Sequence, residues 1–136
     1  MSENKKIAMV VSDGTFDKAM MPFIMGVTAA SMGMNVHIFF TFFGLMVLKK
    51  GAKPKMGGMF RLFTGMIERR MKNAGVESLK EQIETAKDLG IHLYACSTSM
   101  NVMGVKESDL VEGVKVVGAA KFLDIAADSD VQLFIG

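Results

Sequence analysis

The sequence predicts a doubly wound, flavodoxin-like α/β domain with a mostly parallel five-stranded sheet and helices on both faces. Five short apolar runs rich in branched residues predict the strands, at residues 7–11, 35–40, 91–95, 115–117 and 131–135. Helix-like segments separate these runs, as is typical of parallel strands joined by crossover helices. The runs are continuously apolar rather than alternating, which indicates strands that are covered on both faces.

The length and composition predict one domain, residues 1–136, that associates with copies of itself. A chain of 136 residues matches the usual size of a single domain. Half of its residues are apolar, which is more than so small a fold can bury, because small domains have a high ratio of surface to volume. We therefore expect the surplus to lie in the interfaces of a homo-oligomer.

The connections between the strands differ in length. After the first strand we expect a polar turn at residues 12–15 and a helix over residues 17–32, with Gly33 as its carboxyl cap. About fifty residues separate the second strand from the third, more than a crossover helix needs. We expect an insert there, with a short helix, a lysine-bearing loop and two further helices, at residues 44–50, 51–58, 65–72 and 78–89. The lysines suit either an anion or acidic partner, or simple solvation.

Several function classes have little support. The net charge is only +2 and the chain has one tyrosine and no tryptophan, so a nucleic-acid surface is not expected. The longest apolar stretch, residues 36–48, is interrupted by polar residues and falls short of the roughly 20 residues of a membrane-spanning helix. Residues 2–6 are polar and show no targeting signal, so we expect a cytoplasmic protein.

Polar residues follow three of the predicted strands, where open α/β sheets bind their ligands. That place is beyond the carboxyl ends of the strands, where the strand order reverses. The candidates can converge only if the three strands are neighbours. They are Ser12, Asp13 and Thr15 after the first strand, Thr41 after the second, and Cys96, Ser97, Thr98 and Ser99 after the third.

Cys96 is the only cysteine in the chain. One cysteine and two histidines exclude an internal disulfide and show no zinc-site spacing. The polar residues 97–99 indicate the start of a short helix through Met103, where unpaired backbone N–H groups favour thiolate over thiol. The alternative is that Cys96 only packs in the core. His37 and His92 lie inside predicted strands, so we expect core or interface roles for them.

Three segments carry a resemblance to a known family. Residues 96–104 read Cys-Ser-Thr-Ser-Met-Asn-Val-Met-Gly, residues 12–20 lead into the first helix, and residues 39–45 leave the second strand. These segments resemble the DsrE/DsrF/DsrH-like family of small sulfur-handling proteins. The resemblance extends over nearly the whole chain. The resemblance implies a five-stranded parallel sheet, homotrimers or homohexamers, and a cysteine that carries sulfur as persulfide or bound thiosulfate.

The resemblance makes Cys96 the sulfur acceptor of a carrier or sulfurtransferase, with no cofactor. Some relatives have a second cysteine after the acceptor, whereas residues 101–106 contain none. Any disulfide formed during turnover must therefore be intermolecular, which favours transfer of sulfur to the thiol of a partner protein.

We expect hydroxyls and backbone N–H groups to surround the carried sulfur. They come from Ser97, Thr98, Ser99 and Thr41, with Ser12 and Thr15 on the opposite wall. Lys18 either neutralises a bound thiosulfonate or is merely solvated, and Asp13 caps the turn. Two alternatives remain open, a nucleotide- or flavin-binding module and a structural subunit of a sulfur-transfer complex. The first lacks a G-x-G-x-x-G motif after the first strand.

Overall fold

The protein was analysed as a computed structural model that describes residues 5–136. Five parallel strands form one sheet in the order β4-β3-β2-β1-β5. The predicted parallel sheet is thereby confirmed, with strand ends within one residue of those expected. The strands are β1 (Lys6–Val11), β2 (Asn35–Phe40), β3 (His92–Cys96), β4 (Lys115–Val117) and β5 (Val131–Ile135). Residues 2–4 of the polar amino terminus lie outside the described residues.

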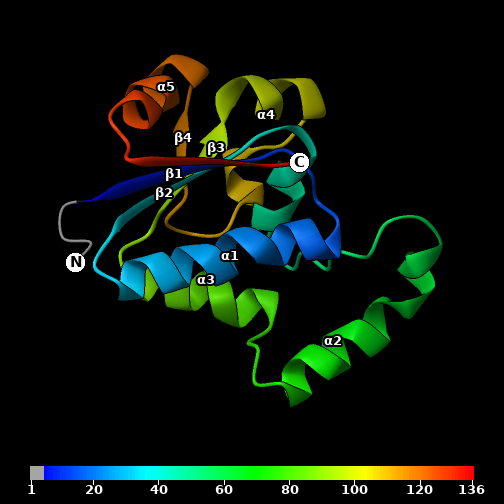
Figure 1. Cartoon of the computed structure of the whole chain (residues 1–136). Helices are drawn as coiled ribbons and strands as arrows, with labels where there is room; N and C mark the ends of the chain where they lie inside the picture. Colours follow the sequence, from blue (N-terminus) through cyan, green and yellow to red (C-terminus); the bar gives the residue numbers. More distant parts are fainter. Residues whose placement is uncertain (1–4) are drawn as a thin grey trace.

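Helices cover both faces of the sheet, as expected for a doubly wound fold (Figure 1). The first face carries α1 (Phe16–Ser31) and α3 (Leu79–Asp88), and the second carries α4 (Ser97–Met103) and α5 (Ala119–Ala127). The carboxyl cap of α1 is Met32, one residue before the predicted Gly33, which follows with a φ of 89° and donates its N–H to the Ala30 carbonyl.

The two faces have separate hydrophobic cores of unequal size. The larger core lies under α1 and α3 and includes Met9, Phe23, Ile38, Phe40 and Leu93. The smaller core contains Ala8, Phe39, Tyr94, Cys96 and Phe122. Phe122 of α5 stacks on Phe39 with ring centroids 4.5 Å apart. Phe122 is the one buried residue of α5, so this helix contributes few side chains to the smaller core.

The insert between β2 and β3 contains more helix than the sequence indicates. A 3₁₀ helix, η1 (Phe42–Leu48), starts two residues before the short helix predicted at 44–50. A second one, η2 (Gly58–Phe63), occupies residues for which no helix was expected and runs into α2 (Thr64–Asn73). Figure 1 shows α2 extending away from the sheet.

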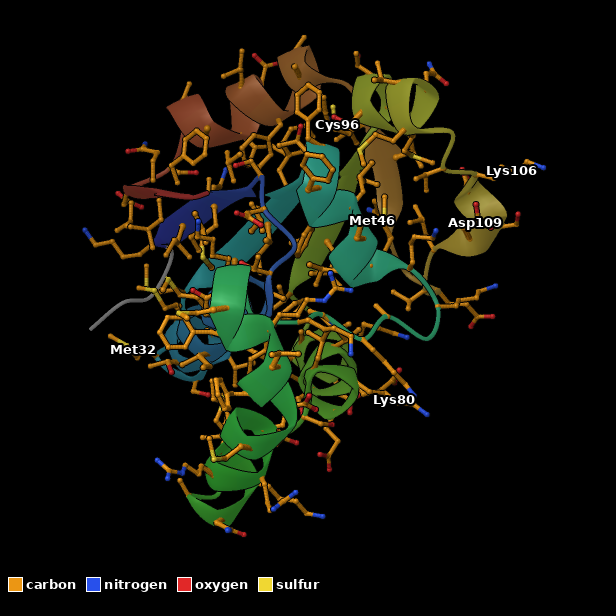
Figure 2. All side chains as sticks on the ribbon, turned by 90° about the vertical axis from the view of Figure 1, so that its right-hand side faces the viewer. Met32, Met46, Lys80, Cys96, Lys106 and Asp109 are labelled. Atoms are coloured by element: carbon orange, nitrogen blue, oxygen red, sulfur yellow. The ribbon has the colours of Figure 1, made fainter. Side chains whose placement is uncertain are left out.

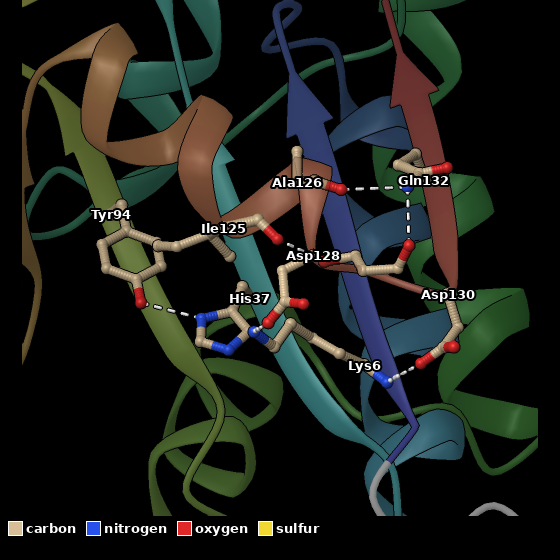
Figure 3. A network of polar contacts seen from close by, with 9 residues as sticks. Lys6, His37, Tyr94, Ile125, Ala126, Asp128, Asp130 and Gln132 are labelled. Carbon is tan, nitrogen blue, oxygen red and sulfur yellow. Dashed lines mark hydrogen bonds and ion pairs between the residues drawn. The ribbon is translucent and has the colours of Figure 1, made fainter.

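The remaining connections are short. A third 3₁₀ turn, η3 (Glu107–Asp109), lies between α4 and β4. The α5–β5 turn is held by Lys6, whose ammonium pairs with Asp128 at 3.0 Å and whose backbone N–H donates to Asp130 (Figure 3). Among residues 5–136, no helix is long and apolar enough to cross a membrane.

Candidate functional site

The carboxyl ends of β1, β2 and β3 lie in register at one edge of the sheet. Val11 pairs with Phe40, and Phe40 pairs with Ala95. The next residues, Ser12, Thr41 and Cys96, therefore form a row across the sheet edge. Neighbouring strands are about 4.8 Å apart, and paired residues of parallel strands point to the same face. The predicted convergence is thus met for this row, because the three strands are neighbours.

Cys96 is the last residue of β3 and the amino-terminal cap residue of α4. The sequence placed it one position beyond the strand and assigned the cap to the residues that follow. Its side chain is only 6% exposed and packs in the smaller core beside Phe39, Tyr94 and Phe122. The thiol therefore lies at the start of a helix, near the sheet edge (Figure 2), and is almost fully buried.

Polar groups beside the sulfur favour its ionised form. Burial raises the pKa of the Cys96 thiol, but the Ser99 hydroxyl and backbone N–H, the Thr41 hydroxyl and the Thr98 N–H together hold that pKa below its ordinary value. The thiol closes no ideal cap hydrogen bond with the residues that the structure describes. These donors are therefore placed to donate hydrogen bonds to the thiolate once it forms.

Ser99 and Thr41 join the two strand ends around Cys96. The hydroxyl of Thr41, after β2, lies 2.8 Å from the hydroxyl of Ser99 in α4. Ser99 is 1% exposed, and its hydroxyl has Thr41 as its partner, so the geometry of the pair is constrained on both sides. Thr98 is exposed and contributes its backbone N–H rather than its hydroxyl. Ser97 is half-buried and faces Gly118 before α5.

The residues at the start of α1 form a separate group. Asp13 accepts the backbone N–H of Thr15 at 3.0 Å and pairs with the Lys18 ammonium at 3.2 Å. The Thr15 N–H and Lys18 hold the pKa of Asp13 below its usual value, against burial. Asp13 thus caps the turn, as predicted. Lys18 has an ion-pair partner, so its position needs no bound anion to explain it.

Thr15 lines a cavity of about 340 Å³ between the β1–α1 turn and the insert. Its lining also includes Phe43, Met46, Lys55 and Arg61, and does not include Cys96. Among the residues predicted to bind substrate, Thr41, Ser99 and the Thr98 backbone lie around the sulfur. Ser12 belongs to the same row two strands away, whereas Thr15 and Lys18 are associated with the α1 group.

Two glycines allow η1 to cross the end of β1. A side chain at Gly14 would place its Cβ 2.6 Å from the Phe43 carbonyl oxygen, and one at Gly44 would meet the Val11 carbonyl. Gly14 therefore serves close backbone packing. Phe42, immediately after Thr41, has a φ of 49°, a strained value for a residue with a side chain. The sequence contains no signal for this strain, which arises from the close crossing.

The two histidines lie side by side in β2 and β3. His37 is 8% exposed, stacks on His92 at 4.5 Å and has its Nδ1 2.8 Å from the Tyr94 hydroxyl. Burial, and then the charges of His92 and Lys6, lower the pKa of His37 to about 4. Its Nε2 has no hydrogen-bond partner among the described residues. No group of three or more His, Cys, Asp or Glu side chains there has the arrangement of a metal site.

Comparisons with known proteins agree with this architecture. Two solved structures share the fold at low sequence identity. The ychN protein of E. coli superposes with a TM-score of 0.72 at 13% identity, covering 96% of this chain and 98% of that chain. MTH1491 of Methanobacterium thermoautotrophicum, a protein of unknown function, gives 0.69 at 12%, covering 96% and 99%.

Sequence relatives extend over the whole chain. The sulfur carrier protein DsrE2 of Allochromatium vinosum is 32% identical over 158 aligned positions, covering 98% of this chain and 99% of that protein. The uncharacterized protein YrkE of Bacillus subtilis is also 32% identical and covers 98% of each chain. The sequence profile of the DsrE/DsrF/DrsH-like family matches residues 3–61 and 53–134. The chain therefore belongs to the DsrE/DsrF/DrsH-like family.

Proposed function

We propose that this protein is a sulfur carrier that binds sulfane sulfur or a thiosulfonate covalently on Cys96 and passes it to the thiol of a partner protein. The observation that supports this most directly is the cradle of donors around a single cysteine, which lowers the pKa of its thiol despite burial. Membership of a family that includes a protein named sulfur carrier DsrE2 supports the same role.

The transfer needs no external oxidant. In loading, the Cys96 thiolate attacks the sulfane sulfur of a donor persulfide, forms a new S–S bond and expels the donor thiolate. With tetrathionate, the same attack leaves a thiosulfonate on Cys96 and expels thiosulfate. In delivery, a partner thiolate attacks the outer sulfur of the Cys96 persulfide, and the Cys96 thiolate leaves. Each step breaks one S–S bond and forms another, and the leaving group is a thiolate or thiosulfate, so electrons balance.

The surrounding residues stabilise charge in this scheme and move no proton. Ser99, Thr41 and the Thr98 N–H stabilise first the thiolate and then the anionic outer sulfur. Ser12, in the same row, lies on the far side of Thr41. We propose that Ser97 lies at the solvent-facing border of the site. Thr15 and Lys18, at the start of α1, would contact an anionic sulfur donor as it approaches.

The absence of a second cysteine limits the cycle. Cys96 is the only cysteine in the sequence, so an internal disulfide cannot release the sulfur. The acceptor must bring its own thiol to a side chain that is 6% exposed. We therefore propose that partner docking widens the approach to Cys96, and that the protein works in a compartment that keeps thiols reduced, such as the cytoplasm.

Intact-protein mass spectrometry after incubation with polysulfide, tetrathionate or thiosulfate tests this function. We expect an adduct of one sulfur or one thiosulfonate, which a reductant reverses and which Cys96→Ala lacks. Thr98→Ala is the matched control, because it removes an exposed hydroxyl and keeps the backbone N–H, and it should load normally. If folded Cys96 accepts neither sulfur nor an alkylating reagent at neutral pH, the thiol is a packing residue and the function is wrong.

The same samples test self-association. Exposed apolar side chains remain on the edge strand β5 and on α5, where Phe134 is 74% and Leu123 is 65% exposed. We propose that further copies of the chain cover them in a homotrimer or homohexamer. Native mass spectrometry counts the copies, and a monomer at all concentrations would contradict this part.

A further inference from the structure

The charge of the protein is concentrated in one segment. We call residues 49–73 the arm, which comprises the lysine loop, η2 and α2. The arm contains eight lysines and arginines and one glutamate, a net charge of +7, whereas the whole chain carries only +2. The rest of the chain is therefore net negative. None of the eight basic residues forms an ion pair with another described residue.

The centre of the arm exposes large apolar side chains. Leu62 is 87% exposed, Met59 76% and Phe60 58%, and Phe63 and Met66 are also exposed. Exposed apolar residues that are scattered singly need no explanation, but a contiguous group rimmed by charges marks an interaction surface. These five residues fall within eight positions of the sequence.

The rest of the arm fixes this group in place. The Lys55 carbonyl accepts the Phe16 N–H at 2.8 Å, and the Thr64 hydroxyl accepts the Met56 N–H at 2.9 Å. Ile67 and Met71 of α2 pack against the larger core. The buried side of the arm is thus already occupied, and the exposed apolar group is a second surface that faces solvent.

We propose that the arm docks on an anionic lipid bilayer. Basic residues attract the negative headgroups, while the exposed Leu, Phe and Met side chains enter the boundary of the acyl chains. A second copy of the arm would bring two sets of like charges together. An acidic protein would satisfy the charges but gives no reason for a leucine that is almost fully exposed. The helices have six and ten residues, so the arm lies on the surface and does not span the bilayer.

The docking surface is made of other residues than those around Cys96. Figure 2 views the carboxyl edge of the sheet, with Cys96 at the top near α4 and α5 and α2 at the bottom. The surface does not depend on the proposed function, and Cys96→Ala should bind lipid as the wild type does.

Vesicle co-sedimentation tests the docking surface. We expect the full chain to bind vesicles of phosphatidylcholine and phosphatidylglycerol in equal parts, to bind pure phosphatidylcholine much more weakly, and to dissociate as salt rises. Leu62→Gln should weaken binding about tenfold, and Arg69→Gln and Arg70→Gln about fivefold each. Val102→Gln is the matched control, because it replaces an apolar, 70% exposed side chain of α4 on the other face of the sheet (Figure 1).

Three results would overturn the docking surface. They are no binding to anionic vesicles at low salt, equal binding by Leu62→Gln and the wild type, and equal loss of binding in Val102→Gln. If Leu62→Gln instead breaks an oligomer of a chain that ignores lipid, the group is a subunit contact. Binding of an acidic polypeptide in place of vesicles would assign the arm to a protein partner. Circular dichroism melts check that each variant folds.

Discussion

At the residue scale, the state of the Cys96 thiol depends on competition between burial and hydrogen-bond donors. Burial alone would raise the pKa of the Cys96 thiol, because the residue is only 6% exposed. The donors reverse this, and Ser99 supplies two of them, its hydroxyl and its backbone N–H. The reactivity of the thiol should therefore depend more on Ser99 than on the hydroxyl of Thr41 or of Thr98.

Ser99→Ala should move the alkylation of Cys96 to higher pH. The thiolate is the reactive form, so the pH midpoint of the rate reports the pKa, which lies below its ordinary value in the wild type. Loss of the Ser99 hydroxyl raises that pKa, so the rate at pH 7 falls while the plateau at high pH remains. The profile is measured with iodoacetamide, with Thr98→Ala as control. An unchanged midpoint would show that the hydroxyl does not act on the sulfur.

At the scale of elements, η1 holds the site together by crossing the end of β1. It follows Thr41 directly, so its position decides whether the Thr41 hydroxyl reaches Ser99. The crossing depends on Gly44, which lies against the Val11 carbonyl and has no room for a side chain. A displacement of η1 should disturb the sulfur site and the fold together.

Gly44→Ala should destabilise the protein by about 1–3 kcal/mol, because its Cβ forces the backbone of η1 away from β1. It should also slow sulfur loading, since Thr41 moves with η1. Gly65→Ala is the control, because Gly65 lies in α2 with open space where a Cβ would be, and there the change should be neutral or slightly stabilising. Urea unfolding measures the stability of both variants. Equal stability of the two variants would show that the crossing is not tight.

At the scale of the whole molecule, the face of the sheet that α4 and α5 cover contains a buried titratable residue, His37. His37 connects β2 to β3 through Tyr94 and His92, and its pKa of about 4 in the folded state lies below the ordinary value of 6.5. The unfolded chain therefore binds a proton that the folded chain does not, over this interval. Stability contributed by neutral His37 is present above pH 6.5 and is lost as the pH falls toward 4.

Between pH 7 and pH 5, this histidine alone should reduce the free energy of unfolding by about 2 kcal/mol. His92, whose pKa burial also lowers, adds to the loss with the same sign. His37→Phe keeps a stacking ring and removes the titration, so its stability should change less over this range. Urea unfolding at the two pH values measures the difference. An equal loss in wild type and variant would place the titration elsewhere.

The sequence by itself determined the strands and singled out the candidate nucleophile. A continuous run of apolar residues such as 35–40 is stable only in a strand that is buried on both faces. Gly33 has the positive φ expected at the carboxyl end of a helix. A single cysteine after a strand identified the candidate site without coordinates. The family resemblance is confirmed by the comparisons. The insert was predicted less well, because η2 has little buried surface to impose a helical period.

Only the tertiary structure decided which polar residues surround the sulfur. Thr41 and Ser99 are 58 positions apart and meet because β2 and β3 are neighbours in register, whereas Asp13 and Lys18 are close in sequence and pair with each other. Strand order, the crossing of η1 and the outward position of Leu62 depend on contacts between distant segments. Local pattern can predict a strand or a helix start, but distances between side chains on different strands follow from packing.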